Sequence, residues 1–369
     1  MSPSEELPLR WTVIAKRTFD LSPGARAVKA KEQLPLAGAD IHAGEPATTP
    51  VRYESDFAPF KPVADALCVG MAYPPGGPAG FCNVSFGVGP WTKTIAVFGD
   101  RDWISRLRGL AIGVSHPKPF ESMPVSFENA FGGPNMFAPD GFDFYGQNRV
   151  GKGYARRGLR FAAVPLPLPL PNLEDPAQPI RNIGDRPVPK SFGPVGRTWQ
   201  PRLSLAGTYD KHWLKHRSPK LPEDFDERYY NCAPEDQQIE GYLRGDEEIR
   251  VTNMHPLHRD LRCRLPAIRM RCIIERRNGA NTALDDAAMN LDTLFVDMEA
   301  MQMILVWRAR LSRELLAPGS RVLLAEESLD RAHPVETYRA QFACADAAEL
   351  PEAEPDESAW AIPPIEESE

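Results

Sequence analysis

The sequence predicts a mainly β fold, a β-rich α+β chain whose antiparallel sheets form a sandwich-like body with a long proline-rich loop region and few short helices. Two observations predict it. Apolar and polar residues alternate with a period of two near both ends of the chain, as in half-buried strands. The 369 residues also include 38 prolines, roughly twice the average usage of about 5%. Prolines are dense between Pro117 and Asn231, and each one fixes φ and removes a backbone donor, which argues against long helices there.

Strand patterns fill the first hundred residues. Apolar and polar side chains alternate in "RWTVIAKRTFDL" (10–21), and "DALCVGMAY" (65–73) predicts a second strand. The segment "CNVSFGVGPWTKTIAVFG" (82–99) predicts two strands joined at Gly89-Pro90, a turn signal. This part of the chain is therefore expected to be a meander that forms half of a β-sandwich.

The rest of the chain alternates between loops and strands. Short helices are predicted at residues 102–110 and 208–216, strands at 261–277, 320–328 and 335–344, and a hairpin at 291–311 that turns at residues 298–301. We expect an N-terminal β-rich domain (1–115), a proline-rich loop region packed between or on the sheets (116–235), a C-terminal β-rich part (236–345) and an acidic tail (346–369).

Acidic side chains are concentrated at the C-terminal end. Residues 349–369 hold eight acidic side chains and no basic one, which leaves 42 of the 50 acidic residues against 43 basic ones in the body. We expect the tail to be disordered. A nearly neutral body argues against nucleic-acid binding, which needs a basic surplus or patch. The basic run "RVGKGYARRGLR" (149–160) is more typical of a solvated face.

The six cysteines are scattered, with no Cys-x-x-Cys pair, so the sequence predicts neither a disulfide framework nor a zinc ribbon. Cys68, Cys82, Cys263 and Cys272 lie in strand patterns and are interpreted as small buried apolar residues. The N-terminus has no secretory-signal pattern, and no apolar run approaches the ~20 residues of a membrane helix. These observations favour a cytoplasmic protein.

No cofactor or phosphate site is predicted. The segment "GPVGRT" (193–198) is only faintly similar to a phosphate-binding loop, because Arg197 stands in place of the lysine and Pro194 removes a backbone donor. A helix cannot continue through Pro201.

Two sets of side chains were considered for chemistry. The histidine pairs lack the glutamate of a zinc-protease helix and are interpreted as hydrogen-bonded or solvent-facing; they are His212 with His216 and His255 with His258. Loop carboxylates could form an acid/base pair of a hydrolase, although turn carboxylates that accept backbone N–H groups are the favoured interpretation. These carboxylates are Asp100, Asp102, Glu128 and Asp143.

The segment "FGPVGRTWQPR" (192–202) is interpreted as a locking loop that helps to shape a binding surface. Gly193 and Gly196 are expected to adopt φ values that other residues avoid. Trp199 can bury a large apolar area and is expected to anchor the loop; the alternative is that it is exposed and contacts a partner. Arg197 and Arg202 offer forked donors to carboxylates or loop carbonyls, in a structural or a partner-contact role.

A second candidate surface lies on the strand 267–277. Period-two alternation places Arg269 and Arg271 on one face and Met270, Cys272 and Ile274 on the other. A solvated sheet face is the favoured interpretation. The alternative is that these arginines meet an acidic partner or the acidic tail of the same chain, which requires several weak pairs to act together.

Eight segments together resemble one known family. They are "SDFAPFKPVADALCVGMAYPPGG", "VFGDRDW", "MPVSFENAFGG", "NRVGKGY", "FGPVGRTWQPRL", "AGTYDKHW", "LPEDFDERYYNCAPEDQ" and "LDTLFVDMEAMQMILVWRARL". Their order and spacing, over residues 10–345, resemble a bacterial domain-of-unknown-function family found in type VI secretion gene clusters. The genes of that family typically neighbour those for the spike protein VgrG and for PAAR-like tip proteins.

The resemblance implies an adaptor or chaperone, not an enzyme, that holds an effector or its PAAR-like tip and loads it onto VgrG. The sequence departs from the resemblance at Met71, where a histidine is expected nearby, and around Phe127 and Asn129, where a tyrosine–arginine pattern is expected. Two alternatives remain open: a β-sandwich hydrolase that uses loop carboxylates, and a structural component of the secreted particle.

Overall fold

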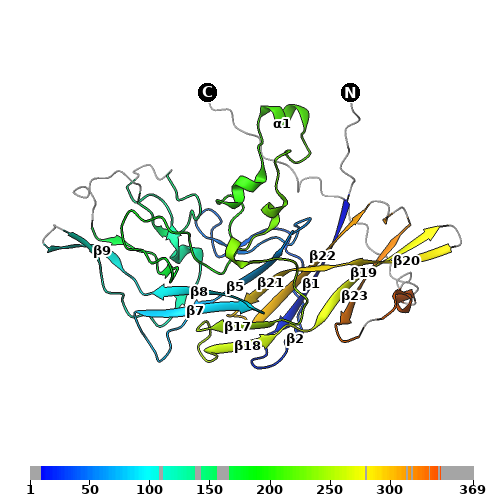
Figure 1. Cartoon of the computed structure of the whole chain (residues 1–369), viewed down its shortest axis with the longest axis horizontal. Helices are drawn as coiled ribbons and strands as arrows, with labels where there is room; N and C mark the ends of the chain where they lie inside the picture. The colour runs from blue at the N-terminus through cyan, green and yellow to red at the C-terminus, as the bar shows by residue number, and fades with distance from the viewer. Residues whose placement is uncertain are drawn as a thin grey trace.

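The structure is a computed structural model of the whole chain, shown in Figure 1. It describes residues 10–107, 111–137, 143–155, 166–278, 281–312, 315–316, 319–331, 333–339 and 341. The acidic tail predicted at residues 346–369 lies outside these residues, as does part of the basic run at 149–160.

The largest sheet has six strands that come from both ends of the chain. In spatial order they are β16 (Gln238–Ile239), β5 (Ala64–Val69), β21 (Asn290–Asp297), β22 (Gln302–Ser312), β1 (Arg10–Asp20) and β2 (Val28–Lys29). The antiparallel hairpin β21–β22 turns at residues 298–301, as the sequence predicts. One pair, β5 with β21, is parallel, so this sheet is mixed.

A five-stranded antiparallel sheet faces the first one. Its strands, in spatial order, are β15 (Leu173–Glu174), β8 (Trp91–Phe98), β7 (Phe81–Val88), β17 (Glu248–Thr252) and β18 (Asp260–Arg264). One hydrophobic cluster contains Phe19, Leu294 and Trp307 from the first sheet together with Phe86 and Val251 from the second. The core therefore lies between two sheets, and the predicted mainly β fold is confirmed.

Smaller sheets lie at the two ends of the long axis, where Figure 1 labels β9 and β20. One consists of β10 (Ala111–Val114), β9 (Asp102–Arg106) and β14 (Leu168–Pro169), and the other of β20 (Asn281–Ala288), β19 (Ile268–Asn278) and β23 (Arg321–Ser328). Three strand pairs complete the set: β3 (Ile41–His42) with β4 (Val51–Tyr53), β6 (Met71–Ala72) with β11 (Met123–Pro124), and β12 (Phe131–Gly132) with β13 (Lys152–Gly153).

Helical structure is short throughout the described residues. The α-helix is α1 (Lys211–His216), inside the segment predicted to be helical, and the 3-10 helices are η2 (Phe127–Asn129), η4 (Arg202–Ala206), η5 (Glu227–Tyr230), η6 (Glu235–Gln237) and η7 (Val335–Tyr338). The helix predicted at 102–110 is wrong, because residues 102–106 pair with two other strands as β9. The strand predicted from residue 335 is also wrong, because η7 occupies its beginning.

Each of the two main sheets combines strands from the N-terminal and the C-terminal parts of the chain. β1 pairs with β22 over eleven residues, and β7 pairs with β17, so strands from before residue 115 and after residue 236 share both sheets. The division of the chain at residues 115, 235 and 345 remains a prediction. Cys68, Cys82, Cys263 and Cys272 are buried, which confirms their interpretation as core residues.

Candidate functional site

The loop 192–202 is locked onto the body by Trp199. The Trp199 side chain is buried, and its ring meets the Phe127 ring edge-on with centroids 5.4 Å apart. A Cβ atom on Gly196 would lie only 3.1–3.2 Å from the indole ring, so a glycine is needed for the ring to lie against the backbone. The prediction that Trp199 anchors this loop is confirmed.

The reason predicted for the two glycines of the loop is wrong. Neither Gly193 nor Gly196 has a positive φ. Gly196 provides space for the ring of Trp199, whereas the nearest atoms to a Cβ on Gly193 lie 3.7 Å or more away, at ordinary contact distance.

Arg202 connects this loop to two other segments. Its Nε donates to the carbonyl of Tyr229 and one terminal nitrogen donates to the carbonyl of Val195, both at 2.8 Å. Its other terminal nitrogen lies 2.5 Å from a carboxylate oxygen of Glu54. Burial alone would lower the pKa of Arg202, but the Glu54 carboxylate outweighs burial and raises it. Arg202 is therefore a fully charged, buried anchor.

The segment that follows the residue-230 end of this region is held by a second group of buried polar contacts. Asn231 donates from its side chain to Asp65 and Cys232 donates from its backbone N–H to the same carboxylate, both at 2.9 Å. Lys61 forms a 2.7 Å ion pair with Asp65. Burial would raise the pKa of Asp65, but Lys61 and these hydrogen bonds outweigh it and lower the pKa.

Arg197 lies at the rim of the same cluster of charges. Its side chain is 38% exposed and lies 3.1 Å from the carboxylate of Glu54 and 3.3 Å from that of Asp40. The structure thus assigns Arg202 to the interior and leaves Arg197 within reach of a partner.

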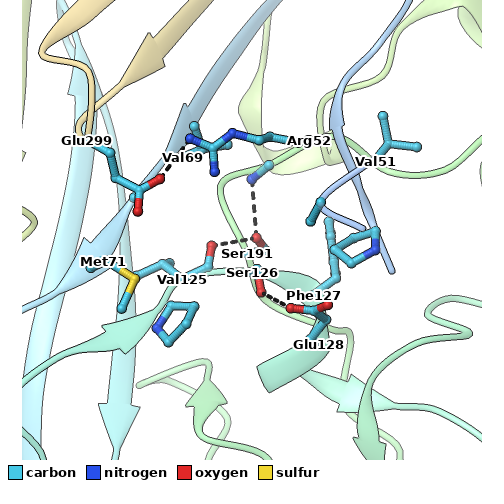
Figure 2. Close-up of a pocket in the computed structure, with 15 residues that line it drawn as sticks. Val51, Arg52, Val69, Met71, Val125, Ser126, Phe127, Glu128, Ser191 and Glu299 are labelled. Atoms are coloured by element: carbon cyan, nitrogen blue, oxygen red, sulfur yellow. Dashed lines mark hydrogen bonds and ion pairs between the residues drawn. The ribbon is translucent and has the colours of Figure 1, made fainter. Parts of the chain in front are cut away.

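A pocket of about 230 Å³ opens beside this loop, and Figure 2 shows the side chains that line it. The wall includes Gly193 from the loop, Ser191 directly before the loop, Met71 from β6 and Phe127 from η2. The Ser191 hydroxyl donates to the carbonyl of Val125 at 3.1 Å and accepts from the N–H of Gly193 at 3.2 Å. The loop therefore forms part of the pocket wall, consistent with its predicted role in shaping a surface.

Charged groups lie on opposite sides of this pocket (Figure 2). Arg52 is paired with Glu299 at 2.7 Å and with Asp297 at 2.9 Å, and Glu128 accepts a 3.3 Å hydrogen bond from Ser126. Two carboxylates, Glu128 and Glu299, line the pocket against one guanidinium, which also pairs with Asp297 outside the lining, so the pocket is acidic. Such a pocket can hold a cationic group, whose aliphatic stem can lie against the apolar wall.

Residues 203–230, which we call the arm, project from the body beyond the loop. Figure 1 shows α1 standing away from the sheets at the top of the view. Asp210 caps α1 by accepting a 2.8 Å hydrogen bond from the N–H of Trp213. The Trp213 ring packs against Tyr209 at 4.6 Å and donates to the carbonyl of Lys220 at 2.8 Å. The arm therefore has a small aromatic core of its own.

The outer surface of the arm combines apolar and basic side chains. Leu203, Tyr209, Leu214 and Leu221 are 44–66% exposed. Residues 211–220, the tip of the arm, include three lysines, one arginine and two histidines but no acidic residue.

Arg269 and Arg271 are held by their own chain. Glu327 of β23 accepts from Arg269 at 2.7 Å and from Arg271 at 3.3 Å, and Arg271 also pairs with Asp286 at 2.6 Å. Burial would raise the pKa of Glu327, but hydrogen bonds from the backbone and ring of His333, from Arg269 and from the Tyr338 hydroxyl outweigh it and lower the pKa to about 2. The predicted face exists, but its arginines are already paired within the chain.

Of the four loop carboxylates that could form an acid/base pair, one lies at this pocket. Glu128 is among the residues that line the pocket, whereas Asp100 and Asp143 are not. Asp100 accepts from the side chain of Asn172 at 3.2 Å, and Asp143 accepts from that of Asn135 at 2.8 Å. In the described part of the chain, no three His, Cys, Asp or Glu side chains gather as a metal site would require.

Sequence patterns gave no signal for several of the residues that define this site. Arg52 and Glu299 are 247 positions apart and meet only because β4 lies near the turn after β21. Glu54 and Asp65 sit in unremarkable segments, and their roles depend on partners more than 100 residues away.

The comparisons decide the family. A model of the family described as an uncharacterized protein conserved in bacteria (DUF2169) matches residues 8–308. This chain belongs to that family. The match includes the loop, the pocket and the arm. No curated protein and no solved structure gives a significant match. Met71 and Phe127, where the sequence departs from the resemblance described above, both line the pocket. None of the helices among the described residues is long and apolar enough to span a membrane.

Proposed function

We propose that this protein is an adaptor of type VI secretion, a cytoplasmic bacterial chaperone that binds an effector or its PAAR-like tip domain and helps to load it onto the VgrG spike. The eight segments that resemble adaptors from type VI secretion gene clusters supply the class of function. Features of the arm and the pocket support the choice of a binding surface.

The observation that carries the proposal is the arm. Four large apolar side chains are exposed within residues 203–221, although single exposed apolar residues are the usual pattern on a soluble monomer. Both ends of the arm are anchored by buried polar contacts, an ion pair of Arg202 with Glu54 and a hydrogen bond from Asn231 to Asp65. A projecting apolar surface on a rigid base suits protein binding, because little order has to be gained when the partner arrives.

The pocket offers the partner a second contact. Gly193 in its wall lies ten residues before the arm in the sequence. Its carboxylates, Glu128 and Glu299, favour a lysine or arginine of the partner, and Met71 can pack against the aliphatic part of that side chain. The loop 192–202 contributes Gly193 to the pocket wall and leads directly into the arm, so one segment connects the two features.

Co-purification tests this proposal directly. The full chain is expressed with the effector, the PAAR-like protein and the VgrG protein of its own gene cluster, and complexes are measured by size-exclusion chromatography and calorimetry. We expect a complex with the effector or the PAAR-like protein. A folded chain that binds none of the three proteins would overturn the adaptor assignment, and its recovery from the secreted fraction would identify a structural component of the particle instead.

A further inference from the structure

The tip of the arm carries three lysines that no ion pair within the described residues neutralises. Within the part of the chain that the structure describes, Lys211, Lys215 and Lys220 have no ion-pair partner, and Arg217 is paired at 3.2 Å with Glu223. Leu214, in the middle of this surface, is 66% exposed. The tip is therefore a basic surface with an apolar centre.

The same chain contains a segment of complementary composition. Residues 349–369 carry eight acidic side chains and no basic one, and Trp360, Ile362 and Ile365 lie among them in "ESAWAIPPIEE". These residues are outside the described part of the chain. Arg269 and Arg271, the basic residues first considered as their target, are already paired with Glu327 and Asp286. The tip of the arm, in contrast, places three unpaired lysines within ten residues of one another.

We propose that the tip of the arm, residues 211–220, is a docking surface for the acidic segment 349–369 of the same chain. The carboxylates of the segment pair with Lys211, Lys215 and Lys220, while Trp360 covers Leu214. Exposed ion pairs are individually weak, so an apolar contact at the centre is needed to hold the segment in place. Trp360 lies 19 positions beyond Gln341, a stretch that can span at most about 65 Å.

The docking is strengthened because the acidic segment and the arm belong to the same chain. A segment on the same chain is present at an effective concentration near the millimolar range, so even a weak contact is populated. Under the proposed function, on which this consequence rests, the segment covers the arm until a tighter-binding partner displaces it. The apolar surface is then shielded in the free adaptor. The docking itself does not depend on the adaptor role.

Zero-length carbodiimide crosslinking of the full chain, read by mass spectrometry, tests the docking. We expect crosslinks from residues 349–369 to Lys211, Lys215 and Lys220 to exceed those to the exposed Lys31 and Lys118 by about tenfold at low salt, because several pairs act together. The excess should shrink as salt screens the charges.

Two variants that keep every lysine test how much the apolar contact contributes to the docking. Leu214→Ser should reduce the arm crosslinks several-fold, whereas Leu257→Ser, on another exposed leucine in the loop between β17 and β18, should leave them unchanged. Equal crosslinking to the arm and to Lys31 would overturn the docking and leave the proposed partner surface unaffected. Crosslinks that join isotopically distinct copies in a mixed sample would also overturn it, because they would assign the surface to the tail of a second molecule.

Discussion

Arg202 and Glu54 form an ion pair of 2.5 Å in which both side chains are almost completely buried. The pair joins the base of the arm to the segment after β4. Arg202 also donates to the carbonyl of Val195 in the loop and to that of Tyr229 near the end of the arm. One side chain thus connects three segments that are distant in sequence.

Replacing Arg202 by alanine is expected to destabilise the protein strongly. The substitution leaves Glu54 as a buried carboxylate, and removing one partner of a buried pair costs about 3–5 kcal/mol. Chemical denaturation should show this loss as a lower midpoint. Arg217→Ala, which breaks the more exposed pair with Glu223, is the matched control and should change little. Equal effects of the two substitutions would contradict the anchoring role.

Trp199→Ala is expected to reduce stability by about 3–5 kcal/mol as a large core truncation. The indole ring fills the space between Phe127 and Gly196, and the cavity left behind borders the pocket wall. Thermal unfolding measures the loss. An unchanged melting temperature with lost partner binding would show that Trp199 is a contact residue instead.

Acid should weaken the protein through Glu327. Its pKa is lowered to about 2 in the folded state, below the value of about 4.3 for an unperturbed glutamate. The unfolded chain therefore binds a proton first, so the stability from this group is present above about pH 4.3 and is lost as the pH falls toward 2. Glu327→Gln should flatten the pH dependence of the unfolding free energy over this range. A variant with the same slope as the wild type would remove Glu327 from the acid response.

Neutralising the pocket should weaken partner binding without affecting the fold. Glu128→Gln combined with Glu299→Gln removes two carboxylates near the surface and leaves Arg52 paired with Asp297. We expect affinity for the effector or PAAR-like protein to fall several-fold at low salt, and the difference to shrink at high salt. Glu121→Gln, an exposed glutamate outside the described pocket lining, serves as control. Unaltered affinity of the double variant at low salt would exclude the pocket from the interface.

Alternation predicts strands well where a short turn joins a strand to one of its neighbours. The hairpins β7–β8 and β21–β22 follow from their own residues because a two- to four-residue turn joins them. The prediction of a helix at 102–110 is wrong because residues 102–106 pair with β10, which follows closely, and with β14, more than sixty residues away. The segment from residue 335 fails because the Tyr338 hydroxyl is drawn to Glu327 by a 3.1 Å hydrogen bond, a contact that period-two patterning does not include.

The sequence predicts the loop anchor of the candidate site but not its charged pairs. A tryptophan among glycines and prolines indicates a loop anchor, and Trp199 acts as one. Charge partners could not be predicted, because an arginine can pair with any carboxylate that the fold brings near. Arg269 and Arg271 meet Glu327 only through the register of β19 against β23.

The central claim is that the arm is the surface that binds the partner, and the affinity of Leu214→Ser tests it most directly. Leu214 is 66% exposed and packs into no described core cluster, so the substitution should leave thermal unfolding unchanged. Calorimetry with the effector or PAAR-like protein should show a loss of affinity of at least tenfold, as expected for an apolar residue at the centre of an interface. Leu257→Ser, a leucine that is 81% exposed elsewhere, should bind like the wild type. Wild-type affinity in the Leu214→Ser variant would contradict the assignment of the arm.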